Sequence, residues 1–159
     1  MAMRFGRRLT DALYLDHLKP AVKNAGFDLQ RMDERPKPGL IDQRMEIELR
    51  TAKFLVAELK YENRGAYYEA GFAHALGKPV FYLCEGTRFR RVGTHFDTNH
   101  HFTISWDASN MAKAGEELKT AIRFALPGDA KLTELPRTMC CLSSRLRPAP
   151  PTICPCQRR

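Results

Sequence analysis

Long apolar runs are absent from this sequence. No run approaches the roughly 20 residues that span a bilayer, and the N-terminus lacks the apolar core of a signal peptide. These absences argue against a membrane protein or a membrane partner, and we expect a cytoplasmic location. The 159 residues are 43% hydrophobic, which is ordinary for a globular chain with enough material for one core.

Cysteine is scarce before residue 136, where Cys84 is the only one. The other four form two close pairs near the C-terminus: Cys140, Cys141, Cys154 and Cys156. Neither pair has the two-residue spacing common among zinc ligands, and no histidine accompanies them. We therefore expect no metal and no cofactor. We interpret residues 136–159 as a disordered basic tail rich in Cys and Pro, and residues 1–135 as the folded domain.

Acidic residues are absent from that tail, which makes the charge uneven. Its five arginines carry +5 of the net charge of +8, which leaves +3 for residues 1–135. A mildly basic domain is poor evidence for a nucleic-acid surface, so we expect no nucleic-acid partner. Arg88, Arg90 and Arg91 are either solvated surface residues or phosphate contacts.

Patterns typical of strands and helices alternate along residues 1–135. Apolar runs at 27–32, 54–57, 79–83 and 102–106 predict strands, and amphipathic patterns predict helices over 10–25, from 42, and from 109 or 110. Thr10 and Asp42 are the predicted caps, and Pro20 predicts a kink or a break. Residues 33–40 and 84–101 are predicted loops. The alternation predicts an α/β domain with a doubly wound, mainly parallel sheet of the flavodoxin or Rossmann type, whose first strand is a stub or truncated.

Glu69 lies in a segment of small and aromatic residues that glycine opens and closes. This pattern predicts a short helix with Glu69 in its first turn, where the helix dipole favours an anion. Glu58 ends the preceding strand. Because ligands of parallel sheets bind beyond the carboxyl ends of the strands, we expect both glutamates at that edge. A desolvated carboxylate needs a partner or a task, so both are candidate catalytic residues. The alternatives are a structural carboxylate for Glu69 and a solvated strand end for Glu58.

Histidines cluster around Asp97 in the predicted loop. His95, His100 and His101 have no spacing typical of metal ligands, so a polar loop is the preferred interpretation. His74 follows Glu69 by five residues and is interpreted as a packing or surface residue.

Three stretches of the chain resemble the nucleoside 2-deoxyribosyltransferase superfamily, and especially its bacterial TIR-like branch. They are the strand 54–59 with its acidic residue, the Gly-x-x-x-Glu-x-Gly-x-Ala signature within 63–80, and the region 95–106. Residues 2–6 resemble the end of the first strand, with Arg4 where proline is common. The similarity spans residues 2–128.

The resemblance implies an N-glycosidase or deoxyribosyltransferase in which Glu69 attacks the anomeric carbon of a nucleoside, nucleotide or NAD-like substrate. Glu58 would position or protonate the leaving base. Tyr67 or Tyr68 would orient the nucleophile or stack on a base. Further substrate contacts are implied for Phe5, Gly6, Arg7, Asn63, Gly65 and Asp97. Relatives are often dimers or larger, which implies a homo-oligomer. The branch also includes nucleotide sensors, so the alternative is a non-catalytic nucleotide-binding or signalling module.

Overall fold

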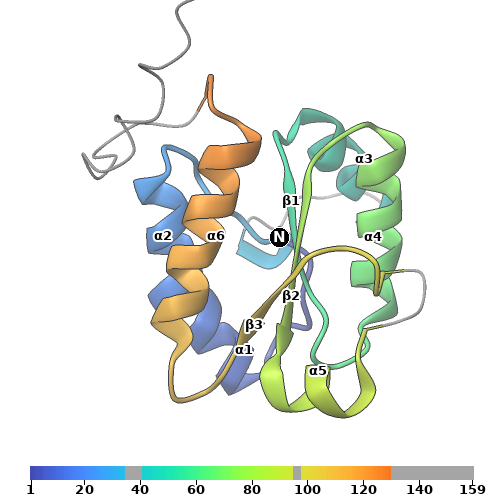
Figure 1. The fold of residues 1–159 in the computed structure, drawn as a ribbon. Helices are drawn as coiled ribbons and strands as arrows, with labels where there is room; N and C mark the ends of the chain where they lie inside the picture. Colours follow the sequence, from blue (N-terminus) through green and yellow to red (C-terminus); the bar gives the residue numbers. More distant parts are fainter. Residues whose placement is uncertain (35–40, 95–97, 130–159) are drawn as a thin grey trace, which may run out of the picture.

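The computed structural model describes residues 1–34, 41–94 and 98–129 (Figure 1). In this part of the chain, one parallel sheet has the order β1-β2-β3, formed by β1 (Leu55–Glu58), β2 (Val80–Glu85) and β3 (Thr103–Trp106). Flanking helices cover the sheet. The predicted α/β class is confirmed, and the arrangement is compatible with a Rossmann-like fold.

The N-terminal stub pairs with the edge of β1 that faces away from β2. Ala2 forms an isolated parallel bridge with Ala57, and its backbone hydrogen bonds to Val56 and Glu58 are both 2.9 Å long. The predicted strand over residues 27–32 is wrong, because none forms there. The α-amino group of Met1 donates to the Gln30 carbonyl, but a single bridge residue in the stub offers no ladder for a further strand.

Helices lie on both faces of the sheet (Figure 1). On one face are α1 (Arg8–Ala12), the π-helix η1 (Leu13–Leu18), α2 (Lys19–Asn24) and α6 (Met111–Ala125). They enclose a first core cluster with members that include Leu18, Val56, Leu83, Ile104, Trp106, Leu118 and Ile122. On the other face, α3 (Ile41–Thr51) and α4 (Arg64–Ala75) enclose a second cluster with members that include Leu49, Ala57, Leu59, Ala66, Ala70, Ala73 and Tyr82.

The first helical stretch changes type along its length without a break. The π-helix precedes Pro20, which lies in the first turn of α2. Proline lacks the N–H that an interior helical position needs, so a wider turn before it accommodates the residue. The prediction that Thr10 caps the first helix is wrong, because α1 already begins at Arg8. The Thr10 hydroxyl instead donates to the carbonyl oxygens of Arg4 and Arg7.

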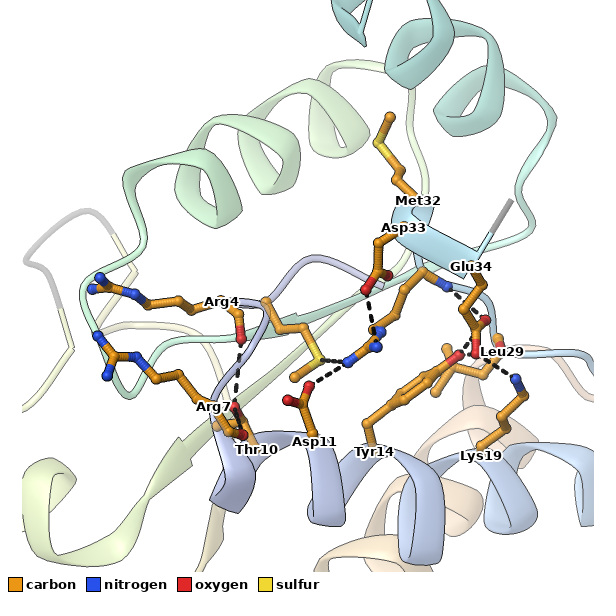
Figure 2. Close-up of polar contacts among 12 residues, drawn as sticks. Arg4, Arg7, Thr10, Asp11, Tyr14, Lys19, Leu29, Met32, Asp33 and Glu34 are labelled. Carbon is orange, nitrogen blue, oxygen red and sulfur yellow. Dashed lines mark hydrogen bonds and ion pairs between the residues drawn. The ribbon is translucent and has the colours of Figure 1, made fainter. Parts of the chain in front are cut away.

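The segment after α2 is fastened to the first helices by polar contacts (Figure 2). Arg31 forms ion pairs with Asp11 and Asp33 at 2.5 and 3.0 Å, and its guanidinium lies 4.6 Å from the centroid of the Tyr14 ring. The Tyr14 hydroxyl lies 2.8 Å from Glu34 Oε2, in the 3₁₀-helix η2 (Met32–Glu34). These contacts hold the segment in place without a strand ladder.

The remaining predicted elements lie close to their expected positions, with one exception. α3 begins at Ile41, before the predicted cap Asp42. α6 follows Asn110, one of the two predicted caps, but the Asn110 side chain forms no capping hydrogen bond among the described residues. The prediction of a loop throughout 84–101 is wrong, because α5 (Gly86–Val92) forms within it. Residues 35–40, Asp97 and the predicted tail lie outside the described residues. None of the described helices has the length and apolarity needed to traverse a membrane.

Candidate functional site

Glu69 lies in the second turn of α4. The helix begins at Arg64 after Asn63, whose side-chain oxygen accepts a hydrogen bond from the backbone N–H of Gly65 at 3.2 Å. The predicted place in the first turn is therefore wrong, because the helix begins before Gly65. The helix dipole acts mainly within the first turn, so it contributes little to the charge of Glu69.

The Glu69 side chain lines a cavity of about 470 Å³. The cavity lies between the start of β1, α3 and the N-terminal stub, and its lining mixes apolar residues such as Met45 and Leu49 with polar ones such as Glu48 and Lys53. Its volume lies within the range of small-molecule sites. This Glu69 cavity is therefore large enough for a nucleoside-sized ligand.

The Glu69 carboxylate is half-buried, and burial disfavours its charged form. Among the described residues, it accepts no hydrogen bond and forms no ion pair. Burial raises the pKa of this carboxyl above its ordinary value of 4.5; the α-amino group of Met1 opposes the shift and Glu48 adds to it. A desolvated carboxylate that faces a cavity is a candidate for chemistry.

Sequence reasoning missed Glu48, a second carboxylate in the Glu69 cavity. Glu48 lies on α3, and its Oε1 accepts a hydrogen bond from Arg44 Nε at 2.9 Å. The signal that could have found it is its position three residues after Met45, on the buried side of the predicted helix.

Glu58 lies on the opposite face of the sheet from α4. It is 1% exposed, and its Oε1 accepts hydrogen bonds from the backbone N–H of Lys60 and from Trp106 Nε1. Trp106 belongs to the first core cluster, whereas α4 packs on the second. Because side chains alternate along a strand, Glu58 points away from α4. The expectation that Glu58 and Glu69 lie together at one edge is wrong, and their catalytic roles stay predictions.

The first loop does not line the Glu69 cavity either. Gly6 has the left-handed φ of 68°, and the Arg31 guanidinium lies 5.4 Å from the centroid of the Phe5 ring. The guanidinium of Arg7 lies 5.5 Å from the Tyr61 ring, just beyond the end of β1. Arg4 and Arg7 extend in the same direction (Figure 2). The loop therefore presents two cations together, and its contact with a substrate stays a prediction.

The other predicted substrate contacts are spread over several places. Tyr68 is 60% exposed. Tyr67 lines a second cavity, on another side of α4. Asn63 serves as the cap of α4, and its acceptor oxygen is used by Gly65. Asp97 lies outside the described residues, so its predicted role is not addressed by the structure.

Comparison with known proteins does not assign a function to these residues. Comparison of the chain with protein-family models, with curated proteins and with solved structures gives no match. Among residues 1–34, 41–94 and 98–129, no group of three or more His, Cys, Asp or Glu side chains could hold a metal ion. The resemblance to the deoxyribosyltransferase superfamily stays a prediction from its sequence motifs.

Proposed function

We propose that this protein cleaves or transfers the N-glycosidic bond of a nucleoside, nucleotide or NAD-like substrate, with Glu69 as the nucleophile. The observation that supports this proposal is the half-buried Glu69 carboxylate, which faces a cavity of about 470 Å³ and has no hydrogen bond or ion pair among the described residues. A structural carboxylate at this depth needs a partner. Among the described residues no group hydrogen bonds or pairs with Glu69, although the α-amino group of Met1 opposes the effect of burial, and this exposure to the cavity favours a reactive role.

The proposed reaction has two steps. The ionised Glu69 carboxylate attacks the anomeric carbon while the bond to the base breaks, which gives a glycosyl ester on Glu69 and a base that takes up a proton. Water or a second base then attacks the same carbon and releases Glu69. Glu48 lines the same cavity and its carboxylate is ion-paired with Arg44, so we assign to it the acceptance of the proton of the attacking water in the second step, while solvent supplies the proton of the leaving base.

A product assay by liquid chromatography tests the proposal. The purified protein is incubated with deoxynucleosides, deoxynucleoside monophosphates and NAD, beside Glu69→Gln and Glu48→Gln. Glu116→Gln is the matched control, because Glu116 lies on α6 with a side chain that is 66% exposed. We expect release of free base by the unmutated protein and by Glu116→Gln, and none by Glu69→Gln. Equal turnover by Glu69→Gln would overturn the mechanism.

The position of Glu58 favours a second candidate function. The strand-end carboxylate that the resemblance pairs with Glu69 lies on the other face of the sheet, away from the cavity. This separation favours a non-catalytic nucleotide-binding module, since binding tolerates a less complete set of reacting groups. Thermal stabilisation by a nucleotide without any product would support it.

The homo-oligomer that the resemblance implies is tested in the same samples by light scattering.

A further inference from the structure

A second cavity, of about 700 Å³, lies beside α4, and none of the described residues that line it also lines the Glu69 cavity. Helix α4 contributes Arg64, Tyr67, Gly71 and His74 to its wall. These positions are three or four residues apart and form one stripe, whereas Glu69 is about half a turn away from that stripe. The two cavities therefore lie on opposite flanks of the same helix.

Three planar side chains stack beside this second cavity: His74 of α4, Tyr82 of β2 and His101 of the loop before β3. The rings of His74 and His101 are 4.9 Å apart with an interplanar angle of 16°, and those of Tyr82 and His101 are 5.2 Å apart at 26°. His74 Nε2 also lies 3.1 Å from the Tyr82 hydroxyl. Burial, with His100 and His74 nearby, lowers the pKa of His101 below 6.5 and favours its neutral form. The cavity thus offers aromatic surface on which a planar ring can stack.

Two arginines line the same cavity, and one of them, Arg64, carries a charge that no ion pair among the described residues balances. Arg88 forms an ion pair with Glu62, 2.5 Å long, so its charge is largely balanced. Arg64 is exposed at the first position of α4, and among the described residues it has no hydrogen bond or ion pair. A guanidinium without a partner is suited to bind a phosphate through two parallel hydrogen bonds.

A buried hydroxyl adds an independent sign of a ligand. Thr94 lines the cavity, and its Oγ1 is buried without a hydrogen-bond partner in the part of the chain that the structure describes. Such an atom costs about 1–3 kcal/mol when it stays unsatisfied. A polar group of a ligand in the cavity would supply the missing bond.

We propose that this second cavity binds a small phosphate monoester that carries a planar aromatic ring, of which a nucleoside monophosphate is the simplest biological example. The ring stacks on the His74 and His101 side chains, Arg64 binds the phosphate, and the Thr94 hydroxyl bonds to a polar group of the ligand. A volume of about 700 Å³ holds one such molecule. The site does not depend on the proposed glycosidic activity.

Isothermal titration calorimetry with adenosine monophosphate tests the site. Titrations use the Glu69→Gln variant as the background, so that turnover cannot consume the probe and binding is measured apart from catalysis. Within it, we expect Arg64→Gln and His101→Ala each to weaken binding about tenfold or more, since each removes one of the two recognition elements. Arg8→Gln is the matched control, because Arg8 is an exposed arginine on α1 that lines neither cavity.

Two fragments of the probe separate the ring from the phosphate. Adenosine lacks the phosphate and ribose 5-phosphate lacks the ring, so each should bind at least about tenfold more weakly than the whole molecule. The proposal is overturned if adenosine monophosphate shows no saturable binding, or if its affinity is unchanged in Arg64→Gln and in a folded His101→Ala protein. Binding that weakens only with Met45→Ala, which alters the Glu69 cavity, would also overturn it.

Discussion

Glu58 and Trp106 are joined across the sheet by a buried hydrogen bond, in which the indole Nε1 donates to Oε1 of the carboxylate at 3.2 Å. The second carboxylate oxygen, Oε2, is buried and has no hydrogen-bond partner among the described residues. Lys60 does not neutralise this charge through an ion pair of its own, because its ammonium pairs with Glu85 at 2.9 Å. Burial accordingly raises the pKa of Glu58 from 4.5 to about 7.

The first prediction concerns stability against pH. Between pH 4.5 and 7, the folded state holds a proton on Glu58 that the unfolded state has lost, so the free energy of unfolding falls as the pH rises. The shift in pKa corresponds to a decrease of about 3 kcal/mol in the free energy of unfolding, which is complete once the pH exceeds 7. We expect Glu58→Gln to lack this loss. Urea denaturation of both proteins at pH 5 and pH 8 measures the difference.

The comparison between the two proteins isolates Glu58, because all other groups titrate in both. Glu117→Gln, on the surface of α6, is a control that should keep the pH dependence of the unmutated protein. Parallel stability curves for the unmutated protein and Glu58→Gln would show that the pKa of Glu58 is not raised by folding.

The second prediction concerns the Tyr14 hydroxyl. It is the buried link between η1 and the segment after α2, with Leu29 O at 3.0 Å and Glu34 Oε2 at 2.8 Å. Tyr14→Phe removes the donor and leaves a buried carbonyl with one bond fewer, so we expect a loss of about 1–3 kcal/mol in the free energy of unfolding. Tyr68→Phe, at an exposed position, should change it by less than about 0.5 kcal/mol. Similar losses in both variants would contradict the structural role of Tyr14.

Apolar periodicity predicted the central strands and helices of this fold well. The runs that became β1, β2 and β3 are short and continuous, and Met45 and Leu49 are buried on α3 as their spacing indicates. Residues 27–32 have a similar pattern but form no strand. The apolar pattern indicates only that the segment is partly buried. To form a strand, the segment also needs a neighbouring strand with enough residues for a hydrogen-bond ladder.

The candidate site was predicted less well, for reasons of side-chain direction. The sequence places Glu58 at a strand end and Glu69 on the next helix, but it does not show which face of the sheet each side chain meets. Helix α4 packs on the face of the sheet that carries the second core cluster, so Glu69 lies on that side. Side chains alternate along β1, so Glu58 points to the opposite face, with the first core cluster. Glu48 comes near Glu69 only through the packing of α3 on α4, which no local motif reports.

The third prediction concerns the packing of α4 on the sheet. Ala66, Ala70 and Ala73 are at most 1% exposed and bring the helix close to β1 and β2. Ala70→Leu adds volume where the helix meets the strands, so we expect a loss of about 1–3 kcal/mol in the free energy of unfolding. Ala75→Leu makes the same change at an exposed position of α4 and should have little effect. Equal stability of the two variants would show that the contact has room for a larger side chain.

The fourth prediction concerns the titration of Glu69 and its link to activity. Burial raises the pKa of this carboxyl above 4.5, and Glu48 contributes in the same direction. If Glu69 must be ionised to attack, kcat/KM rises with pH, and the midpoint of this acidic limb lies above 4.5. Carboxyl NMR titration of the unmutated protein, with Glu69→Gln to assign the signal, measures the pKa independently of turnover.

The Glu48→Gln variant then tests whether the ionisation of Glu69 controls the activity. Removing the neighbouring charge should lower the pKa of Glu69 in the NMR titration, because Glu48 disfavours the ionised form. Glu116→Gln, on α6, should leave it in place. The acidic limb of the residual activity should move with the NMR value. A limb that stays in place while the NMR pKa moves would assign the essential ionisation to another group and remove Glu69 from the role of nucleophile.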